Sequence, residues 1–173
     1  CFGVVPDIMT VAKALTNGTV PMGAVLATAE IHDTFMAAGG PDYQVEFAHG
    51  YTYSGHPLAC AAGLAALDLF EREKLAARAA ELAPYFETVL HGLKGLKHVA
   101  DIRNFGLAGA VQIEAAPGAP ARRPWQIALK CWDAGYYVRY GGDTLQFGPP
   151  LVAEKSDLDG LMNAVADAIL SLE

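Results

Sequence analysis

One lysine near the start of the chain stands between two apolar runs and could act as a nucleophile. Residues 4–11 are rich in β-branched side chains and lead to Lys13, the turn-forming residues 16–18 follow, and a second apolar run covers 21–27. This pattern predicts strand, loop and strand, with Lys13 at the end of the first strand. Apolar walls would favour the neutral amine that a Schiff-base lysine requires. The ordinary alternative is a solvated lysine that discourages pairing at a sheet edge.

A hydroxyl group that could bind an anion belongs to Thr52. It lies in the segment 49–57, which leads directly into an apolar stretch that predicts a helix. A hydroxyl and free backbone N–H groups just before a helix N-terminus form a ready anion site. The alternative is that Thr52 or Ser54 simply caps this helix.

A guanidinium that could hold a carboxylate belongs to Arg139, in the segment 136–145. An arginine fork grips a carboxylate through two parallel hydrogen bonds, a geometry that lysine does not reproduce. The alternative is a strand arginine paired with Asp143 in the same hairpin. No role is assigned to His49 or His56, and no spacing of His, Cys and carboxylate residues matches a metal site.

Three segments resemble, in the same order, the motifs of the class III aminotransferases, which depend on pyridoxal phosphate. I-M-T-V-A-K-A-L-T-N-G at 8–18, followed by V-P-M-G-A-V at 20–25, resembles the cofactor-lysine segment. H-G-Y-T-Y-S-G-H-P at 49–57 resembles H-G-x-T-x-S-G-H-P, and V-R-Y-G-G-D-T at 138–144 resembles V-R-x-x-G-D-T. The strings at 101–110 and 137–150 are most similar to the β-alanine (omega-amino acid):pyruvate branch of the family.

The resemblance implies a role for each candidate residue. Lys13 would hold pyridoxal phosphate as a Schiff base and, once freed by the substrate amine, would shuttle a proton. Thr52 would bind the cofactor phosphate across a dimer interface, at the neighbouring subunit's site. Arg139 would bind the substrate carboxylate. No residue is expected to bind a metal.

The implied reaction moves an amino group from an omega-amino acid such as β-alanine to pyruvate, giving an aldehyde acid and alanine. The implied assembly is a homodimer or a higher homo-oligomer with shared active sites. Two alternatives stay open: another class III aminotransferase or aminomutase with a different amine substrate, and a non-catalytic binding module.

Part of the family's site lies upstream of its lysine, where residues hold the pyridinium nitrogen, the phosphate and the ring. In this sequence they would precede Cys1, which is not a methionine. The chain is therefore expected to be a fragment or a processed piece. Activity is expected to need an N-terminal half that this sequence does not contain.

Composition excludes several classes of protein. Apolar residues make up 53% and charged residues 18% of the 173 residues, as in a globular protein. The net charge of −7 without a basic stripe argues against a nucleic-acid partner. The longest apolar stretch, 57–67, is too short to span a bilayer, and no secretory leader is recognised. Three widely spaced cysteines make no disulfide framework, so the cytoplasm is the expected compartment.

The remaining pattern predicts the elements that position these residues. Helices are expected at 28–38, 57–72, 74–93, 125–133 and 156–172, and strand pairs at 99–104 with 107–115 and at 136–140 with 144–147. The helix at 57–72 is apolar nearly all round and is expected to be buried on most sides. Pro84 is expected to kink or divide the helix at 74–93. Ser156 and Asp159 resemble a capping box.

The fold class expected is α/β, specifically that of the fold type I pyridoxal-phosphate transferases. A boundary is placed near residue 95, where long helices give way to strand pairs. Residues 1–95 would form the C-terminal part of the large cofactor-binding domain, and residues 96–173 the small C-terminal α+β domain.

Overall fold

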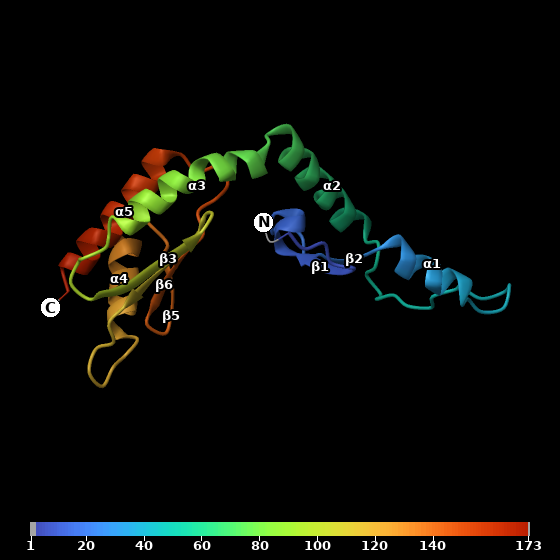
Figure 1. Ribbon diagram of the computed structural model, residues 1–173, viewed down its shortest axis with the longest axis horizontal. Helices are drawn as coiled ribbons and strands as arrows, with labels where there is room; N and C mark the ends of the chain where they lie inside the picture. Colours follow the sequence, from blue (N-terminus) through green and yellow to red (C-terminus); the bar gives the residue numbers. More distant parts are fainter. Residues whose placement is uncertain (1–2, 173) are drawn as a thin grey trace. The chain divides into compact units, whose positions relative to one another are not determined.

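The computed structural model describes residues 3–172 (Figure 1). Cys1, on which the fragment interpretation partly depends, lies outside this range. The chain divides into two compact units, one ending at Glu73 and the other beginning at Lys74. The sequence placed the boundary near residue 95 because α3 (Leu75–His91) was assigned to the first part. In the structure, α3 packs with α5 (Lys155–Leu170) and β3 (Val99–Phe105) of the second unit.

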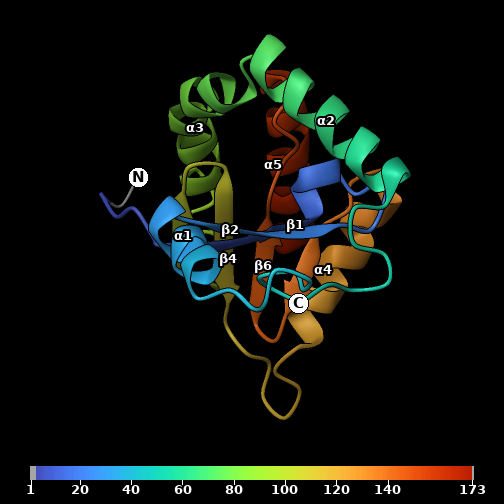
Figure 2. The ribbon, with the colours of Figure 1, turned by 90° about the vertical axis from the view of Figure 1, so that its right-hand side faces the viewer.

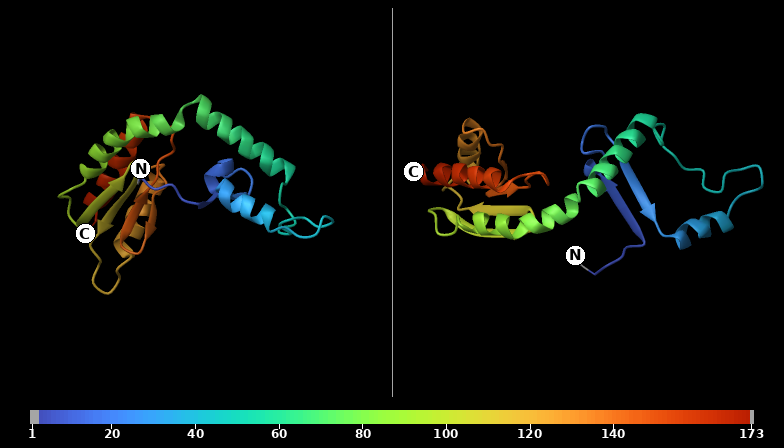
Figure 3. Two further views of the ribbon diagram at one scale, coloured as in Figure 1. Left: turned by 45° about the vertical axis from the view of Figure 1, so that its right-hand side comes forward. Right: turned by 90° about the horizontal axis from the view of Figure 1, so that it is seen from above.

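The first unit consists of a strand pair and two helices (Figure 3). Strand β1 (Ile8–Ala12) pairs antiparallel with β2 (Gly23–Ala27), and the 3-10 turn η1 (Lys13–Thr16) begins the connection between them. Helix α1 (Ala29–Ala37) follows, and α2 (Pro57–Arg72) comes after the long irregular segment that precedes it. The predicted strand, loop and strand around Lys13 are confirmed, as are both helices.

The first unit buries few side chains. Only Thr16, Ala59, Gly63 and Ala66 are buried among its described residues. Leu58, Leu64 and Leu67 of α2 are 62%, 70% and 56% exposed. The expectation that α2 is buried on most sides is therefore wrong for this chain. A helix that is apolar all round needs neighbours on every side, and the described residues supply them on one side only.

The second unit has its own hydrophobic core beneath a four-stranded antiparallel sheet of order β3-β4-β6-β5. The other strands are β4 (Ala108–Ile113), β5 (Arg139–Gly141) and β6 (Thr144–Phe147), and α4 (Arg122–Asp133) is the third helix. Helix α5 contacts both α3 and α4 (Figures 1 and 2). Alternate strand residues enter the core with these helices: Val111, Ile113, Leu145 and Phe147.

Two expectations about the helices can be compared with the structure. Helix α3 is continuous through Pro84, so of the two expected effects, a kink or a division, the division is wrong. The capping box of α5 is formed by Glu154 and Asp157, so the assignment to Ser156 and Asp159 is wrong. The same three-residue spacing occurs two positions earlier, where the backbone N–H of Glu154 donates to Asp157 over 2.8 Å. Asp159 instead accepts a 2.6 Å hydrogen bond from the Tyr85 hydroxyl.

Candidate active site

The backbone at Lys13 is in the left-handed region, with φ of 57°. This conformation costs a non-glycine residue roughly 1–2 kcal/mol. The turn holds it in place: the N–H of Gly18 donates to the carbonyl of Lys13, and the N–H of Asn17 to that of Ala14, each over 3.1 Å. A strained residue that its surroundings hold in place is a recurrent feature of functional sites.

Thr16 anchors the same turn from inside. It is only 2% exposed, and its hydroxyl donates to the carbonyl of Val20 over 2.6 Å. The hydroxyl of Thr19 donates in turn to the carbonyl of Thr16 over 2.7 Å. These side-chain bonds fix the course of the loop that leaves Lys13.

Helix α2 supports the turn through small residues. Ala59, Gly63 and Ala66 are its buried residues, and α2 is in contact with η1. A Cβ added at Gly63 would lie 3.4 Å from the Met22 sulfur and 3.6 Å from the Leu15 carbonyl oxygen. The sequence indicated close backbone approach by α2, but it did not identify the lysine turn as the neighbour. The spacing of these three residues along one helix face was the available signal.

The side chain of Lys13 is exposed and forms no hydrogen bond or ion pair with any of residues 3–172. The apolar walls expected around it are thus not made by this part of the chain. What the fold supplies instead is a fixed backbone and a free primary amine. That amine is the group a pyridoxal aldehyde would need.

Thr52 lies in the turn that precedes α2, and its hydroxyl has no hydrogen-bond partner among the described residues. The hydroxyl of Ser54 accepts a 2.9 Å bond from the N–H of Tyr51. The N-cap of α2 is His56, and no side chain caps this helix. The alternative that Thr52 or Ser54 caps α2 is therefore wrong.

A phosphate group fits this end of α2. The uncapped N-terminus carries a partial positive charge, and a free threonine hydroxyl lies just before it. A cavity of about 420 Å³ opens between residues 20–23 and the turn at 51–56, although neither Lys13 nor Thr52 lines it. The first unit thus presents an exposed amine and an uncapped helix N-terminus, and among residues 3–172 no hydrogen bond links Lys13 to Thr52.

Arg139 begins the edge strand β5 and is paired in register with Gln146 of β6. It is exposed and forms no hydrogen bond or ion pair with any described residue. It lines a cavity of about 440 Å³ together with aromatic side chains of the second unit: Trp125, Trp132, Tyr137 and Tyr140. A guanidinium without a partner, beside aromatic rings, is suited to a small carboxylate.

Asp143 does not pair with Arg139, so the structural alternative for this arginine is wrong. Its carboxylate accepts hydrogen bonds from the Thr144 hydroxyl and the Gln112 amide, each over 2.9 Å. These two bonds hold the pKa of Asp143 below its ordinary value. Asp143 thus stabilises the β5–β6 turn, and Arg139 stays available to bind a ligand.

Two other features are not found within residues 3–172. No group of three or more His, Cys, Asp or Glu side chains is placed to hold a metal ion there. No helix in that range is long and apolar enough to cross a membrane. Cys60 and Cys131 are free thiols, and burial raises the pKa of Cys131 to about 11.

Comparison with known sequences identifies relatives over nearly the whole chain. The sequence model of the family described as "Aminotransferase class-III" matches residues 1–169. The chain is 60% identical to the beta-alanine--pyruvate aminotransferase of Pseudomonas aeruginosa, over 97% of this chain and 38% of that protein. It is 57% identical to the omega-amino acid--pyruvate aminotransferase of Pseudomonas putida, over 99% of this chain and 38% of that protein. The chain thus spans less than half the length of these relatives and corresponds to a C-terminal part of the first.

Solved structures agree on the fold. An (S)-enantioselective omega-transaminase from Thermomicrobium roseum matches 96% of this chain and 38% of its own, with 34% identity and a TM-score of 0.85. An amine transaminase from an uncultivated Pseudomonas species, in its PLP-bound form, matches 96% of this chain and 39% of its own, with the same identity and TM-score. The predicted fold type I architecture is confirmed, and pyridoxal phosphate is the cofactor these relatives indicate.

Proposed function

Because this chain belongs to the class III aminotransferases, we propose that it carries the attachment lysine and substrate arginine of an omega-amino acid:pyruvate aminotransferase. The reaction moves the amino group of an omega-amino acid such as β-alanine to pyruvate, and the products are an aldehyde acid and alanine. The observation that carries the proposal is Lys13. A free amine stands on a strained, hydrogen-bonded turn within a sequence 60% identical to a beta-alanine--pyruvate aminotransferase.

Lys13 has two tasks in this reaction. Its amine would hold pyridoxal phosphate, and as a free amine Nζ would take the proton from the substrate carbon that bears the amino group. The bound cofactor supplies an electron-accepting ring that stabilises the resulting negative charge. The hydrogen-bonded turn keeps Nζ on a fixed backbone, which limits the orientations that the amine must search.

Arg139 recognises the feature that both substrates share. β-Alanine and pyruvate each carry one carboxylate, and the partnerless guanidinium offers two parallel hydrogen bonds to it.

Thr52 donates its free hydroxyl to the cofactor phosphate at the neighbouring subunit's site. This arrangement requires a homodimer, or a higher oligomer built from it, with an isologous interface. The free thiols of Cys60 and Cys131 support a reducing compartment, the cytoplasm.

The test is borohydride reduction of the complete protein with pyridoxal phosphate, followed by peptide mass mapping. A pyridoxyl adduct on Lys13 is expected, and Lys13→Ala should lose both the adduct and alanine formation from β-alanine and pyruvate. Lys74→Ala is the matched control, because Lys74 is also exposed and also left-handed, with φ of 52°. Absence of any adduct would favour the non-catalytic binding module. An adduct on Lys13 with turnover only of another amine would support transamination but show that β-alanine is not the amino donor.

A further inference from the structure

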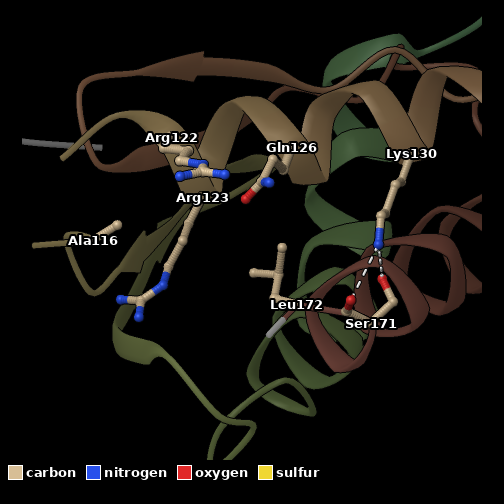
Figure 4. Close-up of a pocket in the computed structure, with 7 residues that line it drawn as sticks. All are labelled: Ala116, Arg122, Arg123, Gln126, Lys130, Ser171 and Leu172. Carbon is tan, nitrogen blue, oxygen red and sulfur yellow. Dashed lines mark hydrogen bonds between the residues drawn. The ribbon is translucent and has the colours of Figure 1, made fainter. Parts of the chain in front are cut away.

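A cavity of about 510 Å³ lies in the second unit between α4 and the end of α5 (Figure 4). Arg122, Gln126 and Lys130 line it from one face of α4, at four-residue spacing. Arg123 lines it from the next position along the helix, and Ser171 from just beyond α5. Three of these five side chains are cationic, and none is assigned a role in the proposed transamination.

None of the three cations is neutralised by a carboxylate within residues 3–172. Arg123 donates to two backbone carbonyls, of Glu114 over 2.7 Å and of Ala115 over 3.1 Å. Lys130 donates to the carbonyl and hydroxyl of Ser171, as the dashed lines of Figure 4 show. The guanidinium of Arg122 has no hydrogen-bond or ion-pair partner in this range.

Of the other four arginines, Arg139 also lacks a carboxylate partner within residues 3–172, but three provide a contrast. Arg72, Arg78 and Arg103 each form an ion pair with a carboxylate, over 2.9, 2.6 and 2.8 Å. The carboxylate of Glu114, whose backbone carbonyl accepts from Arg123, lies 3.2 Å from His98 Nδ1. A chain with a net charge of −7 thus gathers around one cavity three positive charges that no carboxylate of residues 3–172 neutralises. A concave wall lined by charge of one sign concentrates counter-ions of the opposite sign.

We propose that this cavity binds a small anion through a phosphate group. An arginine fork matches the oxygens of a phosphate, and the Gln126 amide is a further donor. The N-cap of α4 is Ala121, which gives no side-chain cap, so the positive end of the helix adds to the field. The cavity is larger than a bare phosphate ion requires and has room for the organic part of a phosphate monoester.

The test is calorimetric titration of inorganic phosphate into the complete protein saturated with pyridoxal phosphate, at constant ionic strength set with chloride. Saturation with the cofactor keeps its own phosphate site filled, so that only other sites respond. Saturable binding is expected, and Arg122→Gln and Lys130→Gln should each weaken it by at least about tenfold. Arg72→Gln, an exposed and paired arginine on α2, should leave it unchanged.

Lack of saturable heat would overturn the proposal, and so would an affinity that survives both Arg122→Gln and Lys130→Gln. The Arg122 side chain has no hydrogen-bond or ion-pair partner within residues 3–172, so its variant should keep the fold, which circular dichroism checks. Titration with glycerol phosphate separates two sources of the phosphate group. Tighter binding than inorganic phosphate would assign the rest of the cavity to an organic part, and weaker binding would restrict the site to the free ion.

Discussion

Lys13, Thr52 and Arg139 share one property at the scale of the residue: each side chain is exposed and has no hydrogen-bond or ion-pair partner within residues 3–172. An ordinary surface lysine or arginine is also exposed, so exposure alone is weak evidence for a functional role. The local framework distinguishes two of them. Lys13 is fixed on a strained turn, and Arg139 lies beside aromatic side chains while its obvious neighbour, Asp143, is engaged elsewhere.

Replacing Arg139 by lysine should weaken substrate binding. A single ammonium cannot form the two parallel hydrogen bonds of the guanidinium, so KM for both β-alanine and pyruvate should rise by about tenfold or more. Steady-state kinetics of the complete protein measure this. Arg103→Lys is the matched control, because Arg103 is an exposed strand arginine already paired with Asp101. Unchanged KM values for both substrates would remove Arg139 from the site.

Asp143 should make the protein more sensitive to acid. Hydrogen bonds from Thr144 and Gln112 lower its folded-state pKa below the ordinary value of 3.8. The stabilisation is therefore fully present above that value and is lost as the pH falls through the lower folded-state pKa. Asp143→Asn should lower the melting temperature at pH 7 and reduce the further loss between about pH 4 and pH 2. Asp133→Asn, at an exposed aspartate of α4, should leave the acid-induced loss unchanged.

Secondary-structure elements in the second unit approach one another closely at Gly109 of β4. A Cβ there would lie 2.8 Å from both Leu90 Cδ2 and Phe86 Cζ, in the fully buried part of α3. Gly109→Ala should therefore destabilise the protein by about 1–3 kcal/mol through overpacking. Gly148→Ala is the control, because a Cβ at Gly148 meets nothing within 4 Å. Thermal melts that give the same midpoint for both variants would contradict this packing.

The elements themselves were largely predictable, because their signals are local. Pro57 begins α2 as expected, and periodic apolar residues identified all five helices. The wrong predictions have two causes: one is competition between similar local sequence patterns, and the other is contact between segments far apart in the sequence. Glu154 and Asp157 offer the same capping geometry as Ser156 and Asp159, and the position of the helix start decided between them. The engagement of Asp143 by Gln112 depends on the pairing of β4 with β6, which no local pattern specifies.

For the whole molecule, the main contrast is in where side chains are buried. Among the described residues, the main hydrophobic core lies in the second unit, from Leu82 to Ile169, and the first unit buries only Ala59 and Ala66 as apolar side chains. Residues 74–173 expressed alone should therefore unfold cooperatively on heating, and residues 1–73 alone should not. Circular dichroism melts of the two pieces test this. A cooperative melt of residues 1–73 would contradict this prediction, because it would show that the unit folds stably while the leucines of α2 remain exposed.

The 173-residue chain by itself should not catalyse transamination. It spans 38% of its first relatives, and residues 3–172 leave Lys13 without apolar walls. The expected measurement is no alanine formation from β-alanine and pyruvate with added pyridoxal phosphate, against turnover by a complete chain. Turnover by the short chain alone would contradict the need for an N-terminal half.

At Lys13, the left-handed backbone also sets selection for stability against selection for activity. Glycine adopts that conformation without steric cost, so Lys13→Gly should melt at a higher temperature than Lys13→Ala while both are inactive. Selection for stability alone would therefore not favour lysine at this position, and only selection for catalytic activity retains it. In a lineage that had abandoned catalysis, position 13 would be expected to drift toward glycine or asparagine, while Thr16 and Gly63, which hold the turn, would persist.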